Sequence, residues 1–205
     1  METQEYTSKN TNFSPGFDIV AIAVSADGLK ALSQIFSTLS ADFPVPIVLV
    51  KHLAAEYRSY LAEILGRTTS LTVKQAEDGE EIHRGAIYIA APNYHLVVKR
   101  GSLALTQTAK IHFSRPSADV LFQSVAESYK ERSLAVVLTG GDSDGAQGVQ
   151  AIKKMGGVVI AQDRETSKVF GMPAAAIATG CVDYILPLNE IAGAIANLVM
   201  TGGIA

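Results

Sequence analysis

The strongest constraint on the fold is an alternation between short apolar runs and segments with helical periodicity. The apolar runs 19–24 and 46–50 are each followed by a segment, 29–39 and 57–65, in which apolar residues recur at helical spacing. The alternation resumes later in the chain with expected helices at 117–129, 146–154, 173–179 and 189–200 and expected strands at 134–138, 158–161 and 182–185. Such alternation predicts an α/β fold: a doubly wound, mostly parallel sheet flanked by helices in three αβα layers.

The segment 71–108 breaks this alternation. Its apolar runs 87–90, 96–98 and 103–105 are separated by Pro92-Asn93 and Arg100-Gly101, which are residue pairs typical of turns. We therefore expect an insert of antiparallel hairpins in the otherwise parallel fold.

Length and composition indicate one folded domain. The chain has 205 residues, enough for a single compact core. Residues 1–16 are rich in Thr, Ser, Asn and Glu and end in Pro15-Gly16, which predicts a disordered lead or a linker. The domain is expected to occupy residues 17–205.

Charge and cysteine content exclude several classes of function. The net charge of −3 favours neither nucleic acid nor an anionic membrane as a partner. Cys181 is the only cysteine, which excludes an intrachain disulfide and a cysteine-based zinc site. The sequence shows neither an apolar signal segment nor an apolar run long enough to span a membrane. We expect a soluble protein of the reducing cytoplasm with no membrane insertion.

Three residues suited to nucleophilic catalysis follow apolar runs. Ser25 follows the run 18–24, His52 follows the run 47–51, and Asp144 lies in a glycine-rich turn after the run 134–139. In a parallel sheet these turns share the carboxyl edge, where ligands of such sheets bind. A serine needs a neighbouring base and a group that orients the base, and these residues supply both types. The sequence therefore predicts a Ser25–His52–Asp144 triad.

Each of the three residues also has a structural interpretation. Ser25 suits a helix N-cap, His52 suits a strand-end histidine bonded to the backbone, and Asp144 suits a turn formed with the following glycine. Only their joint occurrence at strand ends favours catalysis.

Seven blocks of sequence, in one order, carry a resemblance to the catalytic domain of the chemotaxis protein-glutamate methylesterases (CheB). The resemblance extends from about Asp18 to Met200. Its blocks are residues 22–28, Lys51-His52, residues 76–80, residues 87–92 with His95, residues 115–122, residues 138–140 with Asp144-Gly145, and residues 169–173.

The resemblance implies a function as well as a fold. It implies a serine hydrolase that demethylates glutamate methyl esters, and deamidates glutamine, on the cytoplasmic helices of chemoreceptors. Ser25 would be the nucleophile, His52 the general base and then the acid, and Asp144 the group that orients His52. Neither a cofactor nor a metal is implied.

Four further residues are expected to bind the substrate or its oxyanion. The amide of Ala26 is a candidate oxyanion donor if it opens the helix after Ser25, and Gly141 is a second candidate for oxyanion or substrate binding. Arg115 suits either the start of a capped helix, with a proline in the first turn, or the binding of a substrate carboxylate. The resemblance implies that Met172 lines the site.

The chain departs from the family pattern around both catalytic turns. The serine is usually embedded among glycines, whereas this turn holds Ala23, Val24, Ala26 and Asp27, with only Gly28 remaining. Members commonly carry Met-Gly-Asn before the aspartate, and this chain has Gly141-Asp142-Ser143 instead. We expect Asp27 and Asp142 to stabilise the protonated ring of His52 and so to shift activity to alkaline pH.

Two other functions compete with the esterase. Residues 142–145 have the Asp-x-Asp-Gly pattern of phosphatases that use a Mg²⁺-bound aspartate, with Asp27 as a third carboxylate. The stronger alternative is a noncatalytic CheB-like module that binds receptor tails or signalling partners. Full-length methylesterases also carry a receiver domain, which this sequence lacks. It is therefore expected to be a standalone variant, a module that answers to a separate receiver protein, or a fragment.

Overall fold

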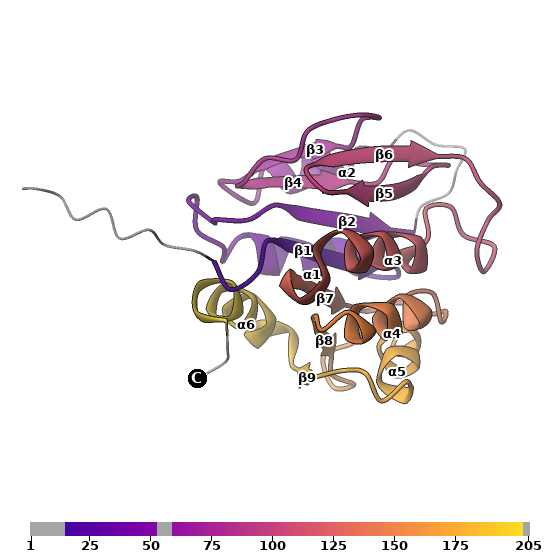
Figure 1. Ribbon diagram of the computed structural model, residues 1–205. Helices are drawn as coiled ribbons and strands as arrows, with labels where there is room; N and C mark the ends of the chain where they lie inside the picture. The colour runs from indigo at the N-terminus through magenta and orange to yellow at the C-terminus, as the bar shows by residue number, and fades with distance from the viewer. Residues whose placement is uncertain (1–14, 53–58, 203–205) are drawn as a thin grey trace, which may run out of the picture.

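The protein is built on a parallel sheet of seven strands in the order β3-β4-β2-β1-β7-β8-β9, seen here in a computed structural model that describes residues 15–52 and 59–202 (Figure 1). The pairs all run parallel, which confirms the predicted doubly wound sheet. The strands are β1 (Ile19–Val24), β2 (Ile47–Lys51), β3 (Thr72–Gln75), β4 (Ala86–Ile89), β7 (Ser133–Val137), β8 (Val158–Gln162) and β9 (Tyr184–Leu186).

Helices cover both faces of the sheet, because alternate residues of its strands point to opposite sides. Ile22 of β1 packs into a core with α1, α2 and α6, whereas Ala21 and Ala23 pack into a second core with α3, α4, α5 and the hairpin β5–β6. The helices are α1 (Gly28–Phe36), α2 (Leu61–Gly66), α3 (Ala118–Tyr129), α4 (Ala146–Lys154), α5 (Gly171–Ala178) and α6 (Leu188–Thr201). The layers are therefore αβα, as predicted.

The strand order reverses at β1, which pairs with β2 on one side and β7 on the other. Ligands of open α/β sheets bind at such a reversal, outside the carboxyl ends of the strands. The turns that follow β1, β2 and β7 lie together at this edge, which is the right-hand side of Figure 1.

The insert is smaller than we expected. Only β5 (His95–Lys99) and β6 (Ser102–Thr106) form an antiparallel hairpin. The expected hairpin at 87–90 is wrong, because β4 lies inside the parallel sheet between β2 and β3. Its unbroken run of buried residues is typical of a parallel strand rather than a half-exposed one. The sequence analysis missed β3, since this edge strand has a largely polar sequence.

The predicted helices are confirmed with small changes at their ends. The bounds of α4 agree fully, and α1 ends three residues earlier than the pattern suggested. The expected helix 57–65 begins at Leu61, and its residues 57 and 58 lie outside the described part.

The expected lead of residues 1–16 lies mostly outside the described residues, apart from Pro15 and Gly16. These two residues already belong to the folded body. The Gly16 amide donates to Val199 O at 2.7 Å, and the Arg132 guanidinium donates to Pro15 O and to both carboxylate oxygens of Asp18. The folded part therefore begins about two residues earlier than predicted.

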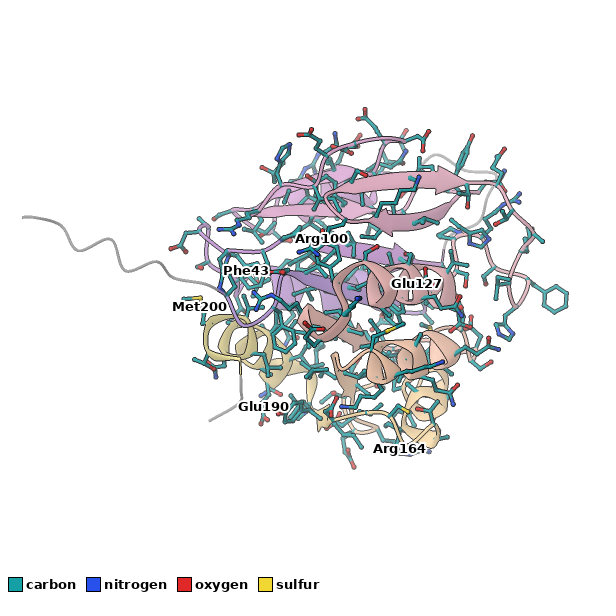
Figure 2. All side chains as sticks on the ribbon, viewed as in Figure 1. Phe43, Arg100, Glu127, Arg164, Glu190 and Met200 are labelled. Atoms are coloured by element: carbon teal, nitrogen blue, oxygen red, sulfur yellow. The ribbon has the colours of Figure 1, made fainter. Side chains whose placement is uncertain are left out.

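Phe43 and Met200, both labelled in Figure 2, lie on the side of the molecule opposite the carboxyl edge of the sheet. These two residues line one surface pocket. Within residues 15–52 and 59–202, no helix is both long and apolar enough to cross a bilayer.

Candidate active site

Ser25 and His52 are neighbours at the carboxyl edge. Val24 of β1 pairs in register with Lys51 of β2, which places the next residue of each strand side by side. The Ser25 amide donates to Thr139 O at 2.9 Å, and the His52 amide donates to Val24 O at 3.1 Å. The backbone hydrogen bonds of the sheet thus continue to Ser25 and His52 and hold the two residues at adjacent positions.

Asp144 binds the imidazole of His52. His52 Nε2 lies 2.7 Å from Asp144 Oδ2, although 92 positions separate the two residues in the chain. A carboxylate only accepts hydrogen bonds, so Nε2 carries a proton in this contact. The fold thus brings His52 and Asp144 into contact, and their roles as base and orienting carboxylate stay predictions.

The Asp144 carboxylate is buried at the N-terminus of α3. Oδ2 also accepts the Ala118 amide at 2.6 Å, while Oδ1 accepts the Asp119 amide at 3.0 Å and the Ser117 hydroxyl at 2.7 Å. Burial acts to raise the pKa of Asp144, but the hydrogen bonds from His52, these amides and Ser117 outweigh it and lower that pKa. The helix N-terminus further favours the charged form. Asp144 is therefore an anionic residue held in a fixed position.

Because these donors occupy both of its oxygens, Asp144 is unsuited to bind a Mg²⁺ ion. Its two oxygens accept hydrogen bonds from two side chains and two amides. Asp142, the other carboxylate of the phosphatase-like pattern, faces His52 instead. These contacts argue against the phosphatase interpretation.

Asp119 is a residue whose role the sequence analysis missed. Its buried Oδ1 accepts the amides of Gly145 and Gly148 at 3.0 and 2.8 Å, at the start of α4. Asp144, which precedes α4, accepts amides at the start of α3. Asp119, in the first turn of α3, accepts amides at the start of α4, so each helix start is capped by a carboxylate from the other segment. Burial and the nearby charge of Asp144 raise the pKa of Asp119, although these amide bonds oppose the shift. An acidic residue in the first helical turn was the available signal.

A second carboxylate lies on the other side of the His52 ring. Asp142 Oδ2 is 3.1 Å from His52 Nδ1, and Asp142 Oδ1 accepts the Asp144 amide at 3.0 Å. Burial of His52 acts to lower its pKa, but the hydrogen bonds and charges of Asp142 and Asp144 outweigh this and raise the pKa to about 9. This supports the expectation that Asp142 stabilises the protonated ring. The second contributing carboxylate is Asp144 and not the exposed Asp27.

The Ser25 hydroxyl has no hydrogen bond to the His52 ring among the described contacts. His52 Nδ1 is buried and, within the described residues, has no hydrogen bond of good geometry in spite of its closeness to Asp142. The structure therefore contains a His52–Asp144 pair, with Ser25 adjacent to His52 but not bonded to its ring.

Two backbone amides remain candidates for donation to an oxyanion. The helix after Ser25 begins at Gly28, with Asp27 in a left-handed conformation before it, so the expectation that Ala26 opens the helix is wrong. Ala26 and Gly141 are nevertheless exposed, and in the described part of the chain their amides donate to no other group. Both amides stay predictions for this role.

Met172 lies beneath the serine turn. It is buried, and its amide donates to Gly140 O at 2.8 Å. A Cβ built on Gly140 would lie 2.1 Å from Met172 Sδ and 3.0 Å from Ser25 Cβ. Met172 therefore packs against the backbone beside Ser25, in keeping with a position lining the site.

This packing predicts that Gly140→Ala destabilises the protein, because Met172 or the serine turn must move to admit the methyl group. We expect a loss of about 1–3 kcal/mol in the free energy of unfolding, measured by chemical denaturation. Gly141→Ala is the matched control, since its Cβ would meet Val169 at an ordinary 3.5 Å. Equal stability of the two variants would contradict the packing.

Arg115 forms hydrogen bonds with a loop. Its guanidinium donates to Asn93 Oδ1 and to the carbonyl oxygens of Gln107 and Thr108. These contacts occupy most of its donors and give no support to binding of a substrate carboxylate. The expected helix start is also modified, because Pro116 precedes the helix and the Ser117 hydroxyl bonds to Asp144 instead of capping α3.

His95 has a structural role. It is fully buried, with Nε2 3.0 Å from Ala109 O and Nδ1 accepting the Ser117 amide at 3.2 Å. Since Nδ1 accepts, Nε2 carries the proton and donates to the carbonyl. His95 thereby anchors the loop that leads to Ser117 and Asp144.

Comparison with known proteins places this arrangement in a family. The CheB methylesterase model matches residues 20–195. The protein-glutamate methylesterase/protein-glutamine glutaminase of Thermotoga maritima is 42% identical over 88% of this chain and 54% of its own length. A relative from Leptospira interrogans, provisionally assigned the same activity, is 40% identical over 86% of this chain and 92% of its own length.

A solved structure agrees with the sequence matches. The crystal structure of the Thermotoga maritima CheB methylesterase catalytic domain superposes with a TM-score of 0.87 at 41% identity, covering 89% of this chain and 99% of that one. The chain spans about half the length of its Thermotoga relative, and a Rhizobium meliloti relative that is 44% identical is likewise covered over 49% of its length. Family model, sequence identity and fold agree: this chain belongs to the CheB methylesterase family.

Proposed function

We propose that this protein is a serine hydrolase that removes methyl groups from glutamate methyl esters of chemoreceptors, and deamidates glutamine at such sites, in chemotaxis-type signalling. The observation that carries the proposal is the 2.7 Å contact between His52 and Asp144 at the strand edge where Ser25 is the neighbour of His52. Membership of the CheB family supports the substrate class.

In the proposed mechanism, His52 accepts the hydroxyl proton of Ser25 while the serine oxygen adds to the ester carbonyl carbon. The amides of Ala26 and Gly141 donate to the resulting oxyanion. The bond to the methoxy group then breaks, and methanol leaves with the proton that His52 held. Water repeats the sequence on the acyl-enzyme and releases free glutamate, and His52 returns the proton to Ser25.

The partners and the compartment follow from the substrate. Methylated glutamates of receptors lie on their cytoplasmic helices, so we place the protein in the cytoplasm beside those helices. The exposed turns 26–27 and 141–143 border Ser25 and are the first surface that such a helix would meet. A separate receiver protein is the proposed regulator.

The test is release of methanol from a methylated receptor fragment incubated with the protein at pH 7 and at pH 9.5. We expect release at both values, faster at the higher one, and an equal amount of new carboxylate on the receptor. Failure to release methanol at either pH would overturn the proposal.

A noncatalytic module is the second candidate, because both ring nitrogens of His52 face carboxylates and Ser25 is not bonded to the ring. Reaction with a fluorophosphonate separates the two functions. Labelling of Ser25 that disappears in His52→Gln supports the esterase. Receptor binding by a protein that resists labelling at every pH supports the module.

The raised pKa of His52 predicts an alkaline profile. The base must be unprotonated to act, and with a pKa of about 9 only about one ring in a hundred is free at pH 7. We expect kcat/KM for a methyl ester to rise about tenfold between pH 7 and 8 and to level off above pH 9.

The measurement is a pH–rate profile corrected for the hydrolysis seen with Ser25→Ala. Asp27→Gly should keep the same acid limb, since Asp142 and Asp144 cause the shift. A limb centred below pH 7.5 in the unmodified protein would contradict the predicted profile.

A further inference from the structure

We propose that Asp142 is a brake on the triad: its carboxylate faces the ring nitrogen of His52 that Ser25 needs and favours the protonated form of that nitrogen. The proposal rests on the proposed function, because it assigns a positioning residue to that reaction. It begins from the two ring contacts, 2.7 Å from Nε2 to Asp144 and 3.1 Å from Nδ1 to Asp142.

The first step is that Nδ1 is the ring nitrogen left for Ser25. Asp144 Oδ2 occupies Nε2, and Asp144 is fixed by Ser117 and two α3 amides. Its side chain is fully buried, so this contact cannot be exchanged without disturbing the start of α3. Ser25 must therefore transfer its proton to Nδ1.

The second step is that Asp142 and Ser25 exclude one another at Nδ1. A carboxylate oxygen at 3.1 Å is favourable only when Nδ1 carries a proton, because the lone pair of a neutral Nδ1 would repel it. A protonated Nδ1 cannot accept the serine proton. The contact with Asp142 thus belongs to an inactive, doubly protonated ring.

The third step is that the brake can be released. The Asp142 side chain is 38% exposed, in contrast to the buried Asp144, and lies in the exposed turn 141–143. When Nδ1 loses its proton to solvent, the carboxylate has no donor there and can turn to water. The Ser25 hydroxyl can then donate to the vacated Nδ1.

Within the described residues, two charged groups contact the His52 ring. Asp142 and Asp144 both come from the loop between β7 and α4, and they supply the opposing hydrogen bonds and charges on His52. Asp119 is coupled to Asp144 through the charge of that residue and is not among the groups that shift the pKa of His52. Of the two facing groups, only Asp142 can be removed without breaking the buried capping arrangement.

Two variants test the brake. Asp142→Asn retains an oxygen for the Asp144 amide and so keeps the turn, while Asp142→Gly removes the side chain altogether. Glu165→Gln is the charge-matched control, an exposed position in the loop between β8 and α5. The readouts are the NMR titration of the His52 ring and the rate of Ser25 labelling by a fluorophosphonate between pH 6 and 10.5.

We expect the titration midpoint of His52 to move from about 9 to near 7 in both Asp142 variants and to stay unchanged in Glu165→Gln. Labelling at pH 7 should rise about fiftyfold in Asp142→Gly, because the free-base fraction of His52 increases from about one in a hundred to about one half. A midpoint that does not move would overturn the brake. So would a lowered midpoint without faster labelling, provided that the unmodified protein still labels at alkaline pH. If no form labels at any pH, the proposed hydrolase function fails, and the brake fails with it.

Discussion

Replacement of Ser25 by alanine is expected to lower kcat for methyl ester hydrolysis by about four to six orders of magnitude. The reason is that the acyl-enzyme cannot form without the hydroxyl, and the orienting pair of His52 and Asp144 then has no nucleophile to activate. Only stabilisation of the oxyanion by backbone amides would remain. The measurement is methanol release at pH 9.5, where His52 is largely free base.

The fold should tolerate this change, because the Ser25 hydroxyl bonds to none of the described residues. The free energy of unfolding is expected to stay within about 0.5 kcal/mol of the unmodified protein. Ser37→Ala, on the exposed end of α1, controls for loss of a serine hydroxyl and should retain full activity. A Ser25→Ala protein with more than a tenth of the original rate would show that Ser25 is not the nucleophile.

Replacement of Asp144 by asparagine is expected to damage both activity and stability. The two carboxylate oxygens accept hydrogen bonds from His52 Nε2, Ala118, Asp119 and Ser117. An asparagine has one acceptor oxygen, so its NH₂ group must face donors. We expect kcat to fall by about 10⁴, the loss seen when the orienting residue of a triad becomes an amide, and stability to fall by about 2–4 kcal/mol.

Asp119→Asn is the matched control for this change. Asp119 accepts both of its amides, from Gly145 and Gly148, through Oδ1 alone, while the buried Oδ2 has no hydrogen bond within the described residues and lies 3.5 Å from His112 Nε2. An asparagine oxygen can keep both bonds, so we expect a loss of less than about 1 kcal/mol. Denaturant unfolding and methanol release together measure both variants. Equal losses for the two substitutions would refute a special role for Asp144.

The contrast between these variants shows which part of the site could be read from the sequence. Ser25, His52 and Asp144 were recognisable because each follows an apolar run, and parallel strands bring such ends to one edge. Asp119 was not recognisable in the same way. Its role depends on α3 and α4 beginning side by side, which no local pattern records.

The fold shows a similar division. β1 and α4 were predicted with their observed bounds, since a buried parallel strand and an amphipathic helix have strong local patterns. β4 was mistaken for part of a hairpin, and β3 was missed. Their partners are chosen by the packing of the whole sheet, and turn residues near a strand do not determine which strand it joins.

The sequence by itself determined the doubly wound sheet, the family and the types of residue at the three strand ends. Periodicity, strand-end placement and matching blocks are all local properties, so they can be read along the chain. Tertiary structure alone decided which atoms meet. It placed Asp144 on Nε2 and Asp142 at Nδ1, directed Arg115 to a loop, and raised the pKa of His52 to about 9. Those outcomes depend on burial and on distances of a few ångströms between segments far apart in the chain, and electrostatic interactions are sensitive to both.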